Sequence, residues 1–194
     1  MDPARAAEFE AVALVHLDAL YKTAHRLTGS REAAEEVVQE TYLRAFRFFH
    51  QFERGTNCRA WLYKILRNTF ASRYAKAKRD PATVDLDEVA PFLGEDDEAL
   101  LEMPTATYQE LLDRVLEDDV RAALMDLPEA YRMVVILADM ESLPYREIAD
   151  IVGVPIGTVM SRLFRGRRAL RGQLVEAARR HGIGRSAQSG GTGR

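Results

Sequence analysis

Residues 144–171 read PYREIADIVGVPIGTVMSRLFRGRRALR, and this stretch decides the fold of the C-terminal half of the chain. A short segment over 144–152 is followed by the turn residues 153–155, and a longer segment then runs through Arg171. This order of helix, glycine turn and helix is typical of a helix-turn-helix. The sequence therefore predicts two helices that meet at Gly153.

The second of these helices carries two different stripes. An apolar stripe at steps of four, three and four residues consists of Val159, Leu163, Gly166 and Leu170. Such spacing places side chains on one helix face, which we expect to pack against Ile148, Ala149 and Val152. A neighbouring stripe of hydroxyls and guanidiniums consists of Thr158, Ser161, Arg162, Arg165 and Arg168. Arginine forks onto guanine or binds phosphate, so this stripe is a candidate DNA-binding face, whereas a merely solvated face is the alternative.

Charge is divided into blocks along the chain, although the net charge is only -3. Residues 54–79 hold 8 basic and no acidic residues, residues 80–119 hold 14 acidic and 1 basic, and residues 120–194 hold 12 basic and 7 acidic. Two basic blocks around an acidic one predict two anion-binding surfaces, joined by a segment that competes for them or occupies another basic site. A solvated charge pattern is again the alternative.

Residues 52–68 interleave aromatic side chains with bases and amides, a mixture that suits unpaired DNA. Aromatic faces stack on exposed bases, amides read the edge of a flipped base, and cations follow phosphates. The candidates for DNA binding in this segment are Asn57, Arg59, Trp61, Lys64, Arg67 and Asn68. Two of them have structural alternatives, because Trp61 has the spacing of a core face and Asn57 lies in a turn beside Gly55.

Helical periodicity dominates the first eighty residues, and strand-like alternation is absent. Gly29 and Ser30 predict a helix end followed by a helix start, and another helix is expected from about Arg59 to Lys78. Periodicity fails beyond, where prolines and acids cluster. We therefore predict an all-α chain with small helical domains over 1–80 and 111–181, a flexible acidic linker over 81–110 and a disordered tail over 182–194.

Composition excludes several classes of protein. The longest uncharged apolar run, 133–138, is far shorter than the roughly 18 residues of a membrane span, and the first ten residues carry acids where a secretory signal carries bases. We expect a cytoplasmic protein without membrane insertion. One cysteine, Cys58, forbids an internal disulfide, and the 4 histidines have no zinc-ligand spacing. The sequence predicts no metal site, cofactor or catalytic residue.

Several motifs in fixed order resemble those of the extracytoplasmic-function (ECF), or group IV, sigma factors of bacterial RNA polymerase. They are AEEVVQETYLRAF at 34–46, AWLYKILRN at 60–68, YREIA at 145–149 and GTVMSRL at 157–163. Segments 49–57 and 155–168 further resemble the thiol-oxidative-stress subgroup. The resemblance implies a non-enzymatic polymerase subunit, whose sigma-2 domain melts and reads the −10 promoter element and whose helix-turn-helix sigma-4 domain reads the −35 element.

The resemblance also implies residue roles and partners. Contact with the clamp coiled coil of core RNA polymerase falls on Glu36, Gln39, Glu40 and Leu43. Asn57 falls in the loop that captures a flipped −10 base, with Lys64, Arg67 and Asn68 on the helix beside it, while Ser161, Arg162 and Arg165 fall on the helix that reads the −35 element. Further implied partners are the polymerase flap, promoter DNA and an anti-sigma factor, in this subgroup a zinc-containing, redox-sensitive one.

One departure from the family pattern limits what can be carried over. Met160 stands where many members have a basic residue, so the −35 preference cannot be copied from them. Two other functions remain as alternatives: a transcriptional regulator whose N-terminal half senses a ligand, and an interaction module that sequesters an acidic partner. The aromatic and basic segment argues against the first, because a ligand sensor has no need of it.

Overall fold

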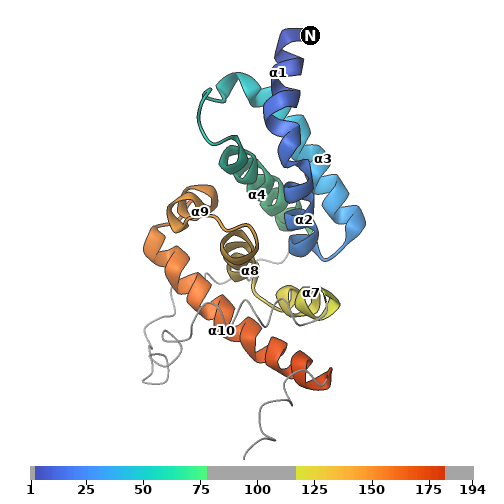
Figure 1. The fold of residues 1–194 in the computed structure, drawn as a ribbon, viewed down its shortest axis with the longest axis vertical. Coiled ribbons are helices and arrows are strands. Elements are labelled where there is room, and N and C mark those ends of the chain that lie inside the picture. Colours follow the sequence, from blue (N-terminus) through green and yellow to red (C-terminus); the bar gives the residue numbers. More distant parts are fainter. Residues whose placement is uncertain (1–2, 78–116, 182–194) are drawn as a thin grey trace, which may run out of the picture.

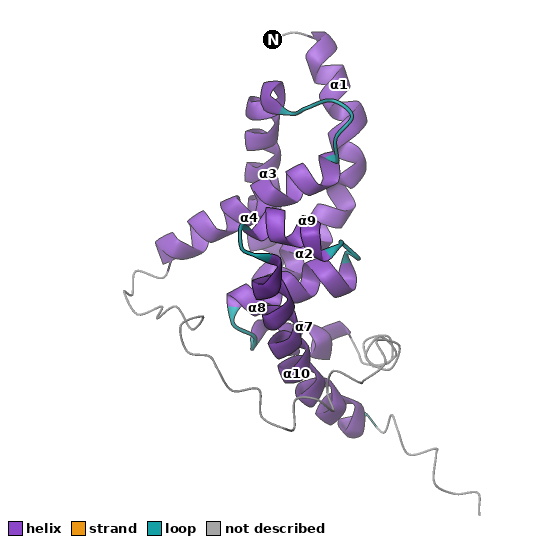
Figure 2. Cartoon of the chain, turned by 90° about the vertical axis from the view of Figure 1, so that its left-hand side faces the viewer, coloured by secondary structure: helices purple, strands orange, loops and turns teal. Residues whose placement is uncertain are grey.

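The computed structural model describes residues 3–77, called here the N-terminal region, and residues 117–181, called the C-terminal region; every regular element in them is helical (Figures 1 and 2). The N-terminal region contains α1 (Pro3–Ala13), η1 (Leu14–His16), α2 (Leu17–Thr28), α3 (Arg31–Phe48), η2 (Phe49–Gln51) and α4 (Cys58–Ala77). The C-terminal region contains α7 (Glu117–Met125), α8 (Glu129–Val135), η5 (Ile136–Met140), α9 (Tyr145–Val152) and α10 (Ile156–Arg180). The all-α prediction is confirmed, whereas the predicted linker and tail lie outside the described residues.

The turn between α2 and α3 follows the expected capping chemistry. Gly29 adopts a left-handed conformation with φ of 69°, and its N–H donates to the carbonyl of His25 at 2.8 Å. Glycine adopts this conformation without the penalty that a Cβ imposes. Ser30 then accepts the N–H of Ala33 through its side chain at 3.4 Å, which begins α3. Both sequence predictions are confirmed.

Prolines occupy the N-cap positions of three later helices. Pro128, Pro144 and Pro155 directly precede α8, α9 and α10. Each has extended ψ, and its carbonyl accepts an N–H from the first turn of the helix that follows. A proline at this place loses nothing through its missing N–H and fixes the direction of chain entry.

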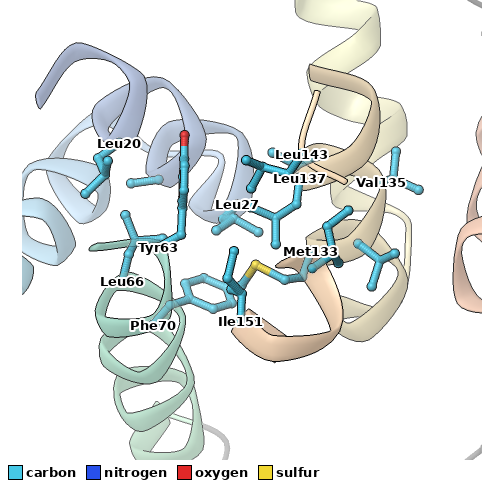
Figure 3. Packing of buried hydrophobic residues seen from close by; sticks show 14 of the residues in the cluster. Leu20, Leu27, Tyr63, Leu66, Phe70, Met133, Val135, Leu137, Leu143 and Ile151 are labelled. Atoms are coloured by element: carbon cyan, nitrogen blue, oxygen red, sulfur yellow. The ribbon is translucent and has the colours of Figure 1, made fainter. Parts of the chain in front are cut away.

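The two regions share one buried core, which the sequence did not predict. Helices α2 and α4 contact α7, α8, α9 and η5, so the C-terminal region packs against the lower end of the N-terminal region in Figure 1. Figure 3 shows Met133 and Ile151 beside the ring of Phe70, and Leu27 beside Leu137. These side chains are at most 5% exposed, so the contact between the regions is dry and apolar. Burial of this kind stabilises roughly in proportion to its area.

Gly166 sets how closely α10 approaches α8, because a Cβ at this position would lie 2.7 Å from Cγ2 of the fully buried Val135. We expect Gly166→Ala to destabilise the fold by about 1 kcal/mol, since overpacking of about 1–3 kcal/mol outweighs the helix-propensity gain of about 1 kcal/mol. Gly172→Ala on the same helix meets open space, and it is expected to stabilise by up to about 1 kcal/mol. Urea unfolding of both variants measures the difference, and equal effects would contradict this packing.

Within 3–77 and 117–181, no helix is both long and apolar enough to cross a membrane.

Candidate functional site

Helices α9 and α10 form the predicted helix-turn-helix, joined through Gly153 in a left-handed conformation with φ of 74°. The predicted apolar stripe of α10 is buried, and α10 packs on α9 and α8. The neighbouring polar stripe lies toward solvent, with Ser161 and Arg168 exposed and Thr158, Arg162 and Arg165 half-buried. Burial of the first stripe therefore fixes the direction in which the cationic stripe points.

Two side chains of the cationic stripe contact groups of the C-terminal region itself. The hydroxyl of Ser161 donates to the carbonyl of Thr158 at 3.0 Å, and Arg165 lies 3.5 Å from the hydroxyl of Tyr131. Two apolar side chains outside the predicted stripes lie near the N-terminal end of α10 and are exposed: Ile156 is 44% exposed and Met160 is 54% exposed. A surface of guanidiniums, hydroxyls and a few apolar groups can contact phosphates, base edges and thymine methyls.

Arg167 differs from its neighbours, because its guanidinium points inward. It binds both carboxylate oxygens of Asp139, and the Asp139 side chain is only 3% exposed. This pair ties α10 to η5. A buried carboxylate of this kind needs a permanently charged partner to offset its desolvation. Arg167 thus fixes α10 against η5, while the next residue, Arg168, is exposed.

The candidate −10 residues lie on two sides of α4. Lys64 and Asn68 are exposed, and Arg67 is half-buried and donates to the side chain of Asn68 at 2.9 Å. Trp61 is partly buried against Phe52, with ring centroids 5.1 Å apart. Helical spacing groups Trp61, Lys64 and Asn68 on one side, which the structure leaves open to solvent next to the aromatic cluster.

Asn57 and Arg59 face the C-terminal region instead. Asn57 caps α4, since its side-chain oxygen accepts the N–H of Ala60 at 3.1 Å, while its amide nitrogen donates to Glu147 at 3.0 Å. Arg59 donates to the carboxylate and the backbone carbonyl of Glu141 at 2.8 and 2.9 Å. The structure therefore does not bring all the candidate −10 residues into one open surface.

Glu141 is the centre of a polar cluster between the two regions and is 7% exposed. Its carboxylate accepts hydrogen bonds from Tyr63 at 2.6 Å and Thr23 at 2.9 Å, besides that from Arg59, and lies 3.5 Å from Arg26. Sequence reasoning missed Glu141, Thr23 and Tyr63. No periodicity marks such a contact, because the partners are separated by 78 to 118 positions along the chain.

Burial raises the pKa of two groups of α4, Tyr63 within this cluster and Cys58 at the start of the helix. Burial, together with the hydrogen bond to Glu141, raises the pKa of Tyr63 to about 12, so its hydroxyl remains a donor through the neutral range. Burial also raises the pKa of the Cys58 thiol. A thiol with a raised pKa forms less of the reactive thiolate, so Cys58 is expected to be unreactive.

The candidate polymerase-binding residues form one face of α3. Glu36, Gln39 and Leu43 are exposed, and Glu40 is half-buried. Glu40 binds Arg44 at 2.6 Å along the helix, and Glu36 pairs with Arg73 of α4. Leu43 is 60% exposed, an apolar side chain within this acidic face. The face combines charge with a hydrophobic anchor, as protein interfaces do.

Comparison with family models identifies both regions of the chain. Residues 14–80 match the model described as Sigma-70 region 2, and residues 117–170 match that described as Sigma-70, region 4. The two matches follow the order of the helices described above, with the basic end of α4 in the first match and the helix-turn-helix in the second.

Individual relatives agree with these matches. The chain is 37% identical to the ECF RNA polymerase sigma factor SigE of Mycolicibacterium smegmatis over 83% of its own length and 59% of that protein. It is 30% identical to the ECF RNA polymerase sigma factor SigW of Bacillus subtilis over 82% of its own length and 85% of that protein. A solved structure of the sigma factor RpoE of Bartonella quintana, in complex with the anti-sigma factor NepR, superposes with a TM-score of 0.65 at 30% identity, covering 87% of this chain and 97% of that one.

Proposed function

The chain belongs to the ECF RNA polymerase sigma factor family, and from this premise we propose that it binds core RNA polymerase and directs initiation at promoters through two separate DNA contacts. Proteins of this family are transcription initiation factors and not enzymes. The observation that carries the proposal is the outward cationic stripe of α10, held in place by the buried stripe behind it.

The C-terminal region supplies the duplex contact, at the −35 element. Arg162 and Arg165 reach guanine edges or phosphates, Thr158 and Ser161 allow close approach of the backbone, and Arg168 extends the phosphate contacts. Exposed Met160 and Ile156 at the N-terminal end of α10 suit contact with thymine methyls. The −35 preference of this chain therefore differs from that of relatives with a basic residue at the position of Met160.

The N-terminal region supplies the contact with opened strands, at the −10 element. Trp61 offers a partly exposed ring, Lys64 and Arg67 follow phosphates, and Asn68 offers an amide to a flipped base. Asn57 and Arg59 join this surface once they are released from the C-terminal region. A captured base gains roughly 1–3 kcal/mol of stacking against an unpairing cost of a few kcal/mol, so several contacts must act together. The free chain is thus expected to bind duplex promoter weakly.

The acidic face of α3 is proposed to dock on the clamp coiled coil of the polymerase, through Glu36, Gln39, Glu40 and Leu43. The polymerase flap is proposed to receive the C-terminal region.

We further divide the chain into a sigma-2 domain over 1–80, a linker over 81–110, a sigma-4 domain over 111–181 and a tail over 182–194; the spans of the two family matches support this division. As a factor that acts on chromosomal DNA, the protein works in the cytoplasm.

Control by an anti-sigma factor is proposed as well. The similarity to a sigma factor solved with its anti-sigma factor supports such a partner. The motifs shared with the thiol-oxidative-stress subgroup suggest that this partner contains zinc and senses oxidants. The chain has 1 cysteine and cannot run an intramolecular dithiol switch, so the redox chemistry falls to the partner. A requirement of the purified chain alone for oxidant would contradict this division of roles.

The proposed function is tested by co-purification of the full chain with core RNA polymerase, followed by runoff transcription with the reconstituted complex. We expect a stable complex and a promoter-dependent transcript that core polymerase alone does not give. A Leu43→Asp variant leaves the buried core untouched and is expected to weaken the complex, because it removes the apolar anchor of the acidic face. Failure of the chain to bind core polymerase would contradict the proposal and favour a regulator or an interaction module.

A further inference from the structure

The cluster around Glu141 has the construction of an anion site. Its donors, Thr23, Arg26, Arg59 and Tyr63, all belong to α2 and α4 of the N-terminal region, and only the carboxylate comes from the C-terminal region. Thr23 is fully buried and Tyr63 is 1% exposed in the packed chain, and their hydroxyls, both from the N-terminal region, lie 3.4 Å apart. A set of hydroxyls and guanidiniums that converge on one point fits any oxyanion, a phosphate included.

The site adjoins the surface that is proposed to hold the −10 strand. Arg59 lies in the first turn of α4, two positions after Asn57, where the helix dipole adds positive potential. Arg59 also stacks over the ring of Tyr63, with its guanidinium carbon 5.5 Å from the centroid. A DNA strand that reaches Asn57 therefore passes within the range of this group of donors.

The C-terminal region holds Glu141 in place through an uncommon backbone. Glu141 follows the π-helical turn η5, and Ser142 has a φ of 54°, the single positive φ among the non-glycine residues that the structure describes. Strained backbone of this kind persists where surrounding contacts over-determine it and clusters at switch regions. A second carboxylate, Glu147, holds Asn57 at 3.0 Å. Two acids of the C-terminal region thus accept hydrogen bonds from two candidate −10 residues, Asn57 and Arg59.

We propose that Thr23, Arg26, Arg59 and Tyr63 form a phosphate site for the −10 strand, and that Glu141 fills this site from within the chain when no promoter is bound. The proposal rests on the proposed function for the identity of the strand. In the closed form, which is the form described here, the carboxylate of Glu141 occupies these donors. A phosphate of the −10 strand needs the same donors, so the strand binds only to an open form in which Glu141 has left them. The apolar contact between the regions favours the closed form of the free chain.

The experiment measures how the full chain binds a fluorescein-labelled oligothymidylate of about twelve nucleotides, by anisotropy. Glu141→Gln keeps the side-chain size and removes the charge that Arg26 and Arg59 face. We expect this variant to bind at least about tenfold more tightly, because apparent affinity rises with the fraction of chain that is open. Small-angle scattering should give a larger radius of gyration. The matched control is Glu176→Gln, an exposed acid on α10, which is expected to leave both measurements unchanged.

A second variant tests that a phosphate takes the place of the carboxylate. Arg26 is outside the candidate −10 set, and Arg26→Gln added to Glu141→Gln removes one donor of the site. We expect the gain in affinity to fall by several-fold, and the slope of log affinity against log salt to shrink by about 0.7. Should Glu141→Gln fail to fold by circular dichroism, Glu147→Ala opens the same contact from its exposed side, and it is expected to increase binding to a smaller extent.

The outcomes separate cleanly. Unchanged binding by Glu141→Gln, equal to that of the Glu176→Gln control, would overturn the proposal. The proposal would also be overturned if the double variant kept the full gain in affinity of Glu141→Gln and the same salt slope as that single variant. Glu141 would then hold the two regions together without covering a phosphate site. Neither measurement involves polymerase. The proposal of a phosphate site can therefore be wrong while runoff transcription succeeds. Conversely, runoff transcription can fail while the oligonucleotide experiment shows that a phosphate replaces the carboxylate.

Discussion

Replacement of Arg132 by methionine is expected to lower the free energy of unfolding by about 3 kcal/mol. Arg132 is 7% exposed and donates to the carbonyls of Leu27, Met125 and Leu127 at 2.7, 3.1 and 3.0 Å. Each buried carbonyl left without a donor costs about 1–3 kcal/mol, and the apolar methionine recovers only part of this.

The control for this variant is Arg121→Met on α7. Arg121 is half-exposed and pairs with the exposed Asp118 one turn away, so its loss is expected to cost less than about 1 kcal/mol. Urea unfolding followed by circular dichroism measures both variants. Because Leu27 belongs to α2 and Arg132 to α8, the same experiment tests the contact between the two regions. Equal, small effects of the two substitutions would show that Arg132 does not join them.

Simultaneous replacement of Arg162 and Arg165 by alanine is expected to reduce transcription from a promoter with a −35 element by about a hundredfold. Each arginine that reads a guanine contributes about 1–3 kcal/mol of binding, and two such losses add up to about 3 kcal/mol or more. Both are half-buried, and neither belongs to the buried apolar stripe of α10, so the fold should persist.

The matched control removes two arginines from the other end of the same helix. Arg179 and Arg180 are exposed and pair with the acids Glu176 and Asp119. Their replacement by alanine changes the net charge by the same amount and is expected to alter transcription by no more than about threefold. Runoff transcripts with reconstituted polymerase are quantified for both double variants. An equal reduction in the two would mean that charge, and not the position on α10, determines the effect.

Local features of this fold could be predicted because each depends on neighbours in the sequence. Gly29 and Ser30 mark a helix boundary through the left-handed conformation of one and the side-chain cap of the other, both properties of single residues. The buried stripe of α10 follows from helical spacing alone. These features place the helix-turn-helix and its outward face before any tertiary contact is considered.

Contacts between distant segments could not be predicted in this way. Glu141 and Arg59 are 82 positions apart, and nothing in the spacing around either residue indicates the other. Arg167 and Arg168 are adjacent and chemically alike, yet Asp139 draws only the first of them inward. Charge patterning predicted that the acidic segment over 80–119 competes for a basic surface or occupies another basic site, and it gave no sign of the contact that Glu141 makes. Tertiary packing decides such cases, because burial makes one pairing far stronger than its alternatives in solvent.

The central claim is that the two regions hold two separate elements of one promoter, and reconstituted transcription on a promoter library tests it most directly. Sequencing of the transcribed templates should show two enriched elements at a fixed separation. The Arg162→Ala, Arg165→Ala double variant should lose selection for the upstream element alone, and Asn68→Ala should relax selection for the downstream element alone. A single enriched element, or two variants that relax the same element, would contradict the account.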